Sequence, residues 1–310
     1  MFWNARLSLL DWLRANSAMI QQIIMLTLVK GSTYAIVAAG LALIYGVGRI
    51  VNLAHTAFLM LAAYLISFLA VSSGWPLAPS IAVAVIGTGV LGLLFYRFIV
   101  DRVREHQAAV LLITIAVAMG IQQLMPLLFG SLPRPVPLIL EGAWPILGFP
   151  VPKQYVLTLA IAVGFLVLLW LLLARTKMGV AVRAVAQDPE VAGLMGINVS
   201  TVLMIAVGIG TAMAAVAGAL VPAMEGGSVD QYLWLFQLLM VLVIVVLGGL
   251  GSLKGSFIAA FFVAFVQALV SAVFPHQAYL SYAFAMVAMV VVLAVRPQGL
   301  FGTLFEEERL

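Results

Sequence analysis

Long apolar segments separated by short polar ones dominate the chain, and most of them are about twenty residues long. A helix of that length crosses the hydrocarbon core of a bilayer, so each segment predicts a membrane-spanning helix. Seven segments follow one another after the first quarter of the chain, at about 77–96, 108–129, 155–174, 200–222, 233–252, 256–274 and 278–295. The pattern predicts an all-α, polytopic membrane protein with a single domain over residues 1–310.

The N-terminal quarter is harder to divide, because residues 18–71 are almost continuously apolar. Polar residues interrupt this stretch around Lys30 and again around Asn52. We divide it into three pieces, at 18–30, 32–48 and 53–71, which gives about ten crossings in all. The number falls to about eight if the breaks near Asn52 and Gly248 lie inside longer, broken helices.

The loop charges orient these helices, because lysine and arginine gather on the cytoplasmic side of membrane proteins. This rule places the Pro-rich connection 130–152 and the acidic turn 225–230 outside. Both termini are then expected in the cytoplasm, since nine crossings would put Arg6 and Arg14 outside. Residues 1–19 mix charge with aromatics and are expected to be an interfacial segment that is not cleaved. The residues that mark the cytoplasmic loops are Arg97, Arg102, Arg104, Arg175, Lys177, Arg183 and Arg296.

Composition agrees with a membrane protein, since 65% of the 310 residues are hydrophobic and only 8% are charged. There is no cysteine, which excludes disulfides, thiolate metal sites and a cysteine nucleophile. The net charge of +4 is spread over many short loops, as the orientation rule requires, so we do not expect nucleic-acid binding. No catalytic set and no metal-binding cluster is recognisable.

The longest polar interruption on the basic side covers residues 175–198 and carries signals for a short helix. Asp188 can accept hydrogen bonds from free backbone N–H groups, and Pro189 suits the first helical position. Glu190 complements the positive end of the helix dipole, and Gly196 suits a left-handed stop. The spacing predicts a helix of about two turns outside the membrane.

Two apolar stripes run through this segment. Val191, Leu194 and Met195 are spaced as one face of the predicted helix, while Arg183 and Gln187 keep its surroundings polar. An earlier stripe consists of Met178, Val182 and Val185. Two interpretations stay open: the loop lies on lipid headgroups or packs on its own bundle, or it is a docking surface for a soluble partner.

Two polar or glycine-rich breaks interrupt apolar helix elsewhere. The first, at 46–55, leads to Asn52, His55 and Thr56, and the second, at 248–255, contains glycines and Ser252. Paired breaks of this kind point to the substrate path of a transporter and to a possible inverted repeat. Plain helix packing and a structural histidine are the alternatives. The second break is not a phosphate-binding loop, because its spacing does not fit one; its glycines are Gly248, Gly249, Gly251 and Gly255.

Acidic residues are nearly absent from the expected spans, whereas carriers driven by protons or sodium place a carboxylate in the bundle. Active transport would therefore draw its energy from another chain. The rival interpretations are a secondary carrier or channel acting alone and a structural subunit of a membrane complex. Glutamines inside the spans could line a path or join helices, and they are Gln122, Gln123, Gln237 and Gln267.

Four stretches, in the right order, resemble the permease subunit of branched-chain amino acid ABC importers, the LivH type. These are GSTYAIVAAGLALIYGVGRIVNLAH at 31–55, MGVAVRAVAQDPEVAGLMGIN at 178–198, LGGLGSLKGS at 247–256 and RPQGLFG at 296–302. The second resembles the family's cytoplasmic coupling loop, and it is the most specific of the four.

The resemblance implies a subunit of the bacterial inner membrane that pairs, within the lipid bilayer, with a homologous permease of the LivM type or with a second copy. Two cytoplasmic ATPase chains would bind ATP and Mg, and an extracytoplasmic binding protein would deliver the substrate. No cofactor is expected in this chain. The coupling role falls on residues 183–196, with Val191, Leu194 and Met195 as the apolar contacts, and the two breaks would belong to the substrate path.

Three residues depart from the family pattern: Thr56 stands where glycine is common, Lys254 lies in the glycine break, and Lys30 precedes the first Gly-Ser. An added hydroxyl and a nearby cation could change which solute passes. Related systems carry urea, short amides or other amino acids, and these stay as alternatives to a branched-chain substrate. The coupling loop speaks against a sugar-type permease.

Overall fold

The computed structural model describes residues 17–301 except 147, 148, 223, 225, 275 and 278. Helices dominate, as predicted, and two short strand pairs lie between them. The apolar helices are α2 (Ser17–Gly48), α3 (His55–Ser67) with the π-turn η1 (Phe68–Ser72), α4 (Leu77–Phe98), α5 (Gln107–Phe129), α6 (Lys153–Arg175), α9 (Val199–Leu220), α10 (Leu233–Gly248), α11 (Leu253–Val273) and α12 (Leu280–Val295).

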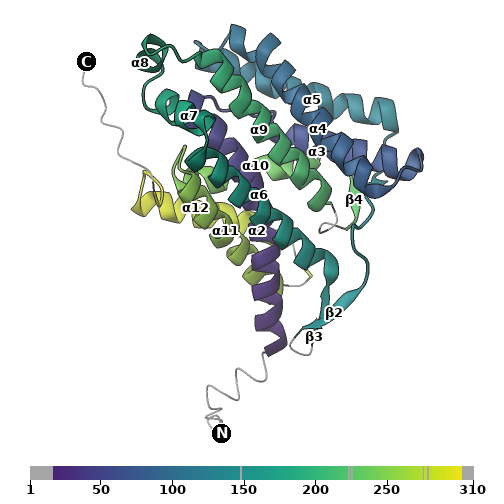
Figure 1. The fold of residues 1–310 in the computed structure, drawn as a ribbon. Coiled ribbons are helices and arrows are strands. Elements are labelled where there is room, and N and C mark those ends of the chain that lie inside the picture. Colours follow the sequence, from purple (N-terminus) through teal and green to yellow (C-terminus); the bar gives the residue numbers. More distant parts are fainter. Residues whose placement is uncertain are drawn as a thin grey trace, which may run out of the picture.

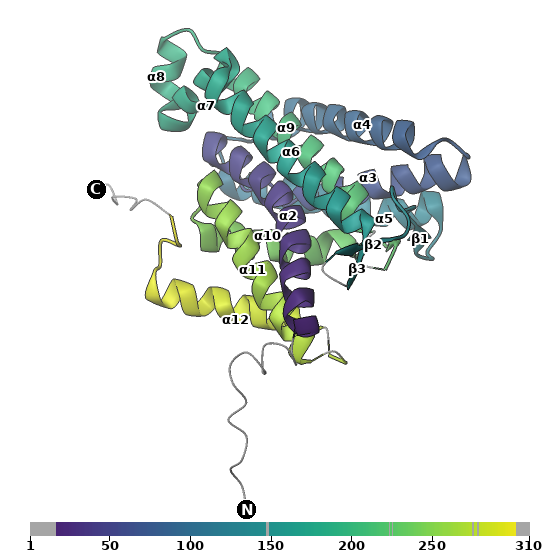
Figure 2. The same cartoon turned by 60° about the horizontal axis from the view of Figure 1, so that its bottom comes forward.

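The remaining elements lie at the two ends of the bundle. Two short helices, α7 (Lys177–Gln187) and α8 (Pro189–Leu194), project at one end, and a hairpin of two strands lies at the other (Figures 1 and 2). The smaller elements are η2 (Val100–Arg102), β1 (Arg134–Pro135), β2 (Ala143–Ile146), β3 (Phe149–Pro152) and β4 (Ser228–Val229); β1 pairs with β4 and β2 with β3, both antiparallel.

Within the described residues, seven helices are long and apolar enough to cross a membrane, and α10 and α12 are shorter apolar helices. The seven spans predicted after residue 76 are all found as helices. The predicted break at Lys30 is wrong, because α2 continues through it for 32 residues. Ser32 turns its hydroxyl back to the Val29 carbonyl, 2.8 Å away, instead of capping a new helix. The stretch that was divided into three pieces therefore forms two helices, α2 and α3.

Gly31 belongs to helix packing rather than to a helix end. A Cβ at Gly31 would lie 2.6 Å from the Phe261 ring, so the missing side chain lets α2 and α11 approach. The two helices run antiparallel, since Gly46 lies against Gly251 at the far end of the contact and the Tyr34 hydroxyl donates to Gln267 Oε1 at 3.0 Å. Small residues thus place α2 at the centre of the bundle.

At about 1.5 Å per residue, α2 is about 48 Å long, and it connects the two ends of the molecule. Gln21 shares a cavity with Pro150 beside the hairpin, whereas Gly48 shares one with Val185 of α7. Phe301, the last described residue, donates its N–H to the Gly248 carbonyl at 3.1 Å, near the α7 end. The prediction about both termini concerns residues 1–16 and 302–310, which lie outside the described residues, as does most of the interfacial segment. The described ends lie at opposite ends of α2.

Candidate functional site

The segment predicted as a coupling loop folds as two helices with well-defined ends. Thr176 starts α7, because its Oγ1 accepts the Gly179 N–H at 3.0 Å. Asp188 starts α8, with Oδ1 accepting the N–H groups of Glu190 and Val191 at 2.9 and 3.0 Å. Gly196 has φ +85°, the left-handed conformation that was predicted for it. The local chemistry of Asp188, Pro189 and Gly196 is therefore confirmed.

The two apolar stripes of this segment have different surroundings. Val182 and Val185 of α7 are buried in the core, and Met178 packs against it, so α7 is anchored. On α8, Ala192 is the buried residue, at 4% exposure. The predicted stripe points outward instead, with exposures of 53% for Val191, 87% for Leu194 and 78% for Met195.

Polar groups complete the attachment of these helices to the bundle. The Arg183 guanidinium donates to the Leu173 carbonyl, one of the last carbonyls of α6, where a cation also complements the helix dipole. Asn198 Oδ1 accepts the Thr201 N–H at 3.0 Å and starts α9. Gln187, Asp188 and Glu190 are exposed. Within the chain, α7 holds α8 in place, and Val191, Leu194 and Met195 do not pack on the bundle.

The first break lies deep in the protein. Arg49 ends α2 with φ +51°, the only positive value for a residue other than glycine in the described part of the chain. After it, Asn52 Oδ1 accepts the Ala54 N–H at 3.1 Å and the Leu53 N–H donates to Thr114 Oγ1 at 3.3 Å. Asn52 and the two residues that open α3, His55 and Thr56, are all buried.

His55 is inserted between α2 and α9. Its Nε2 lies 3.0 Å from the Val37 carbonyl oxygen, which can only accept, so Nε2 carries the proton. Gly40 makes room for the ring, because a Cβ there would lie 3.0 Å from His55 Cε1 and 3.0 Å from the Gly210 carbonyl. Gly40 and Gly210 were not among the predicted site residues; glycine inside an apolar helix was the available signal.

Three polar atoms of this break have no hydrogen-bond partner in the described part of the protein: Asn52 Nδ2, His55 Nδ1 and Thr56 Oγ1. Buried polar groups are normally satisfied, and an unsatisfied one costs about 1–3 kcal/mol. A cluster of three therefore marks a place where water or a polar solute would be stabilised.

The second break, between α10 and α11, is a tight backbone turn. Gly249 and Gly251 have φ values of +100° and +80°, and Ser252 Oγ accepts the Gly255 N–H at 3.1 Å to start α11. A Cβ on Gly248 would lie 2.5 Å from the Gly255 carbonyl carbon. The Leu300 N–H donates to the Leu247 carbonyl at 2.8 Å, so the C-terminal segment covers the turn. Backbone packs on backbone here.

Both breaks contact α2 but not at one place. His55 lies at Gly40 and Gly251 lies at Gly46, six residues further along the same helix, or about 9 Å. Both breaks, which were predicted to belong to the substrate path, therefore contact α2. They do so at different heights along this helix.

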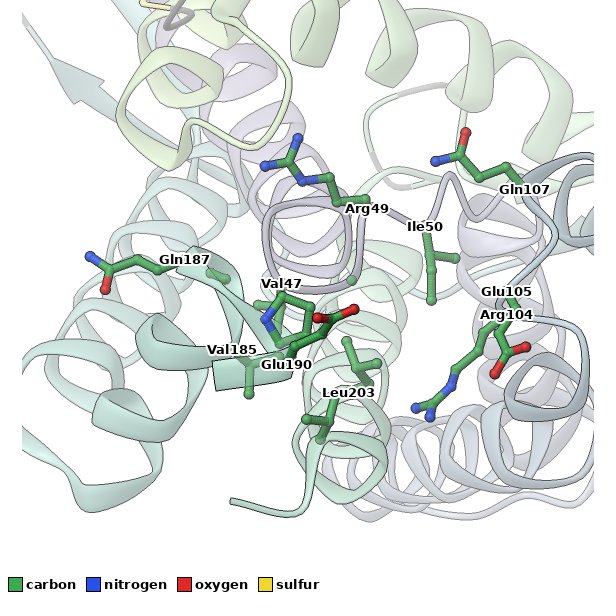
Figure 3. Close-up of a pocket in the computed structure, with 14 residues that line it drawn as sticks. Val47, Arg49, Ile50, Arg104, Glu105, Gln107, Val185, Gln187, Glu190 and Leu203 are labelled. Atoms are coloured by element: carbon green, nitrogen blue, oxygen red, sulfur yellow. The ribbon is translucent and has the colours of Figure 1, made fainter. Parts of the chain in front are cut away.

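A third feature was not predicted as a site. A cavity of about 590 Å³ opens between the end of α2, the connection from α4 to α5, and α7 with α8 (Figure 3). Its charged lining comes from Arg49, Arg104, Glu105 and Glu190. From the sequence, Arg104 was expected only to contribute to the positive charge of a cytoplasmic loop. In the described residues, no group of three or more His, Asp or Glu side chains is placed to hold a metal ion.

Comparison with known proteins identifies the family. The sequence model described as "Branched-chain amino acid transport system / permease component" matches residues 23–293. The chain belongs to this permease family. The match includes both breaks and the whole of α7 and α8, so the resemblance found in the sequence is confirmed.

Curated relatives agree with this membership. The permease is 30% identical to the high-affinity branched-chain amino acid transport system permease protein LivH of Escherichia coli K12, over 88% of this chain and 92% of the relative. It is 29% identical to BraD of Pseudomonas aeruginosa, a permease protein of the same description, over 89% and 93%. These relatives are transport subunits and not enzymes.

Two further matches are more distant. The galactofuranose transporter permease protein YtfT of Escherichia coli is 28% identical over 73% of this chain and 63% of the relative. Among solved structures, PsaBC from Streptococcus pneumoniae in complex with Fab matches with a TM-score of 0.49 and 15% identity, over 91% of this chain and 96% of that chain.

Proposed function

We propose that this permease is the membrane-spanning subunit of an ATP-driven importer for amino acids with apolar side chains. Two cytoplasmic ATPase chains would bind ATP and Mg, and an extracytoplasmic binding protein would deliver the solute. The relatives named for branched-chain amino acids support this substrate class. The second permease of the pair would be a homologue or another copy of this chain.

The observation that carries the proposal is the exposed apolar face of α8, formed by Val191, Leu194 and Met195. Such side chains are normal on helices that face lipid, but α8 projects beyond the bundle (Figure 1), and its neighbours Gln187, Asp188 and Glu190 are polar and exposed. The anchored α7 and the Asp188 cap hold this face in a fixed position. A rigid, apolar helix face is suited to a groove on a partner protein.

The loop charges support the orientation. Arg97, Arg102, Arg104, Lys177 and Arg183 lie in the two connections at the α7 end, so the positive-inside rule places that end in the cytoplasm. The hairpin of β2 and β3, together with the Ser17 end of α2, would then face the binding protein. This placement differs from the cytoplasmic N-terminus expected from the sequence. With this orientation, ATPase chains reach α8 without crossing the membrane.

The mechanism follows from these positions. ATP binding would draw the two ATPase chains together and move the paired α8 helices, and the bundle would alternate between two packings with outward and inward openings. Asn52, His55 and Thr56 would meet the solute, since they place unpartnered polar atoms inside the bundle. The permease itself would carry out no covalent step.

The test replaces Leu194 and Met195 together by aspartate. We expect the double variant to lose co-purification with its ATPase chains and to lose ATP-dependent uptake, because two carboxylates cannot enter an apolar groove without a large desolvation cost. Leu132→Asp is the matched control, since Leu132 is 81% exposed at the other end of the molecule. Normal assembly and uptake in the double variant would contradict the docking role of α8.

The substrate class has a separate test. The purified binding protein of the same transporter is titrated with leucine, with urea and a short amide, and with a furanose sugar. Tight binding of leucine alone supports the proposal. Preference for urea or an amide would move the assignment to that class, and preference for the sugar would connect this permease to relatives such as the galactofuranose permease.

A further inference from the structure

The cavity beside α8 has a mixed lining that suits a small solute. Its volume of about 590 Å³ lies within the range of small-molecule sites. Val47, Ile50 and Leu203 form an apolar wall, and a smaller cavity of about 190 Å³ adjoins it along Arg49 and Arg104. The site is open at the end of the bundle that carries α7 and α8.

Charge in the cavity is balanced. Two guanidinium groups, of Arg49 and Arg104, and two carboxylates, of Glu105 and Glu190, belong to its lining. In Figure 3 Glu190 and Leu203 lie on one side of the cavity, and Arg104 and Glu105 lie on the other. An anion alone would meet repulsion from the carboxylates, and a cation would meet repulsion from the arginines. A zwitterion can pair with one group of each sign, and an apolar side chain can contact the wall of Val47, Ile50 and Leu203.

The cavity is also connected to the parts that would move. Glu190 belongs to α8, whereas Arg104 belongs to the connection from α4 to α5 and pairs with Asp101 at 3.4 Å. Asp101 accepts a hydrogen bond from Ser200 at the start of α9, 2.9 Å away, and one from Arg97 at 3.2 Å. A ligand held by both Glu190 and Arg104 would therefore join α8 to a network at the ends of α4, α5 and α9.

We propose that this cavity binds a free α-amino acid with an apolar side chain, with the ligand carboxylate on Arg104 and its ammonium group on Glu190, and that the bound ligand restrains α8. This regulatory role rests on the proposed function of α8 in coupling. The ligand would enter from the side of the ATPase chains, so the importer would respond to the solute that it accumulates.

The experiment uses the assembled transporter in detergent, without its binding protein, and measures binding of radiolabelled L-leucine by equilibrium dialysis. We expect saturable binding that weakens at least about tenfold in Arg104→Gln and in Glu190→Gln, since each removes one charge-assisted contact. Glu141→Gln is the matched control, because Glu141 lies beside the hairpin at the opposite end. Ile50→Trp, which fills the cavity, should also abolish binding.

The second readout is ATP hydrolysis by the same complex. L-Leucine should lower the rate in the wild type and have no effect in Ile50→Trp. No leucine binding by a complex that assembles and transports would overturn this inference while leaving the proposed function intact, whereas failure of the complex to form would count against the proposed function. Binding that survives both charge variants overturns the cavity as its site. Binding of inorganic phosphate that depends on Arg104 but not on Glu190 would show an anion site instead.

Discussion

The two breaks in the apolar pattern look alike in the sequence but differ in what they bury. The break before α3 buries polar side chains, and three of their atoms lack partners in the described residues. The break between α10 and α11 buries backbone against backbone, with glycines where side chains would collide. The first is a place for a polar ligand or water, and the second is a place for close packing. An interruption of hydropathy alone does not distinguish the two.

The largest effect is expected in the second break, from Gly255→Ala. A Cβ at Gly255 would overlap the Gly248 carbonyl oxygen, and backbone on both sides leaves no side chain to move away. We expect a loss of about 3 kcal/mol or more in the free energy of unfolding, at the upper end of overpacking effects. Thermal unfolding of the purified permease in detergent measures this loss of stability.

The control for this variant is Gly120→Ala in α5, also helical, where a Cβ would meet nothing within 4 Å. We expect it to be neutral or to raise stability by about 0.4–1 kcal/mol, because alanine restricts the unfolded chain. Equal melting temperatures for Gly255→Ala and Gly120→Ala would show that the second break is looser than the structure indicates.

In the first break, His55→Leu should have the next largest effect. The variant removes the hydrogen bond to the Val37 carbonyl while roughly keeping side-chain volume, and we expect a loss of about 1–2 kcal/mol. His106→Leu is the control, since His106 is exposed and its side chain does not cap α5, so the change should stay within about 0.5 kcal/mol. If His55→Leu is as stable as His106→Leu, the imidazole ring has no structural role.

Local signals in the sequence were sufficient where structure depends on neighbouring residues. Asp188, Pro189 and Gly196 define the ends of α8 through their own backbone preferences, and each was predicted correctly. The apolar stripe of α8 was also recognised, although spacing could not show whether it faces the bundle or the solvent. Exposure depends on what the rest of the fold leaves uncovered.

Features that depend on distant segments were missed or misread. Lys30, Gly31 and Ser32 resemble a helix boundary, but Gly31 serves contact with Phe261, more than 200 positions away. The cavity was not predicted because four separate segments form it, near 47–50, 104–107, 185–190 and 199–203. The role of the two breaks as related halves of an inverted repeat stays a prediction.

A smaller effect is expected from Ser252→Ala at the start of α11. Loss of the Ser252 Oγ acceptor leaves the Gly255 N–H without its cap, which typically costs about 1 kcal/mol. Ser252→Asp keeps an acceptor and should restore most of the melting temperature. If the alanine and aspartate variants are equally destabilised, a steric role of Ser252 in the turn replaces the capping role.

The smallest effect on stability, and the most informative one for the comparison, is expected from Thr56→Val. Thr56 Oγ1 is buried without a partner in the described residues, so an apolar group of nearly the same shape should change stability by less than about 1 kcal/mol and can even raise it. If the hydroxyl meets the solute, uptake per assembled transporter should nevertheless fall several-fold, because the solute then loses a hydrogen-bond partner that valine cannot supply. Measuring melting temperature and uptake on one preparation separates the two roles. A drop in uptake at unchanged stability identifies a polar site for the solute, whereas normal uptake by a stable Thr56→Val variant would make the first break a packing feature like the second.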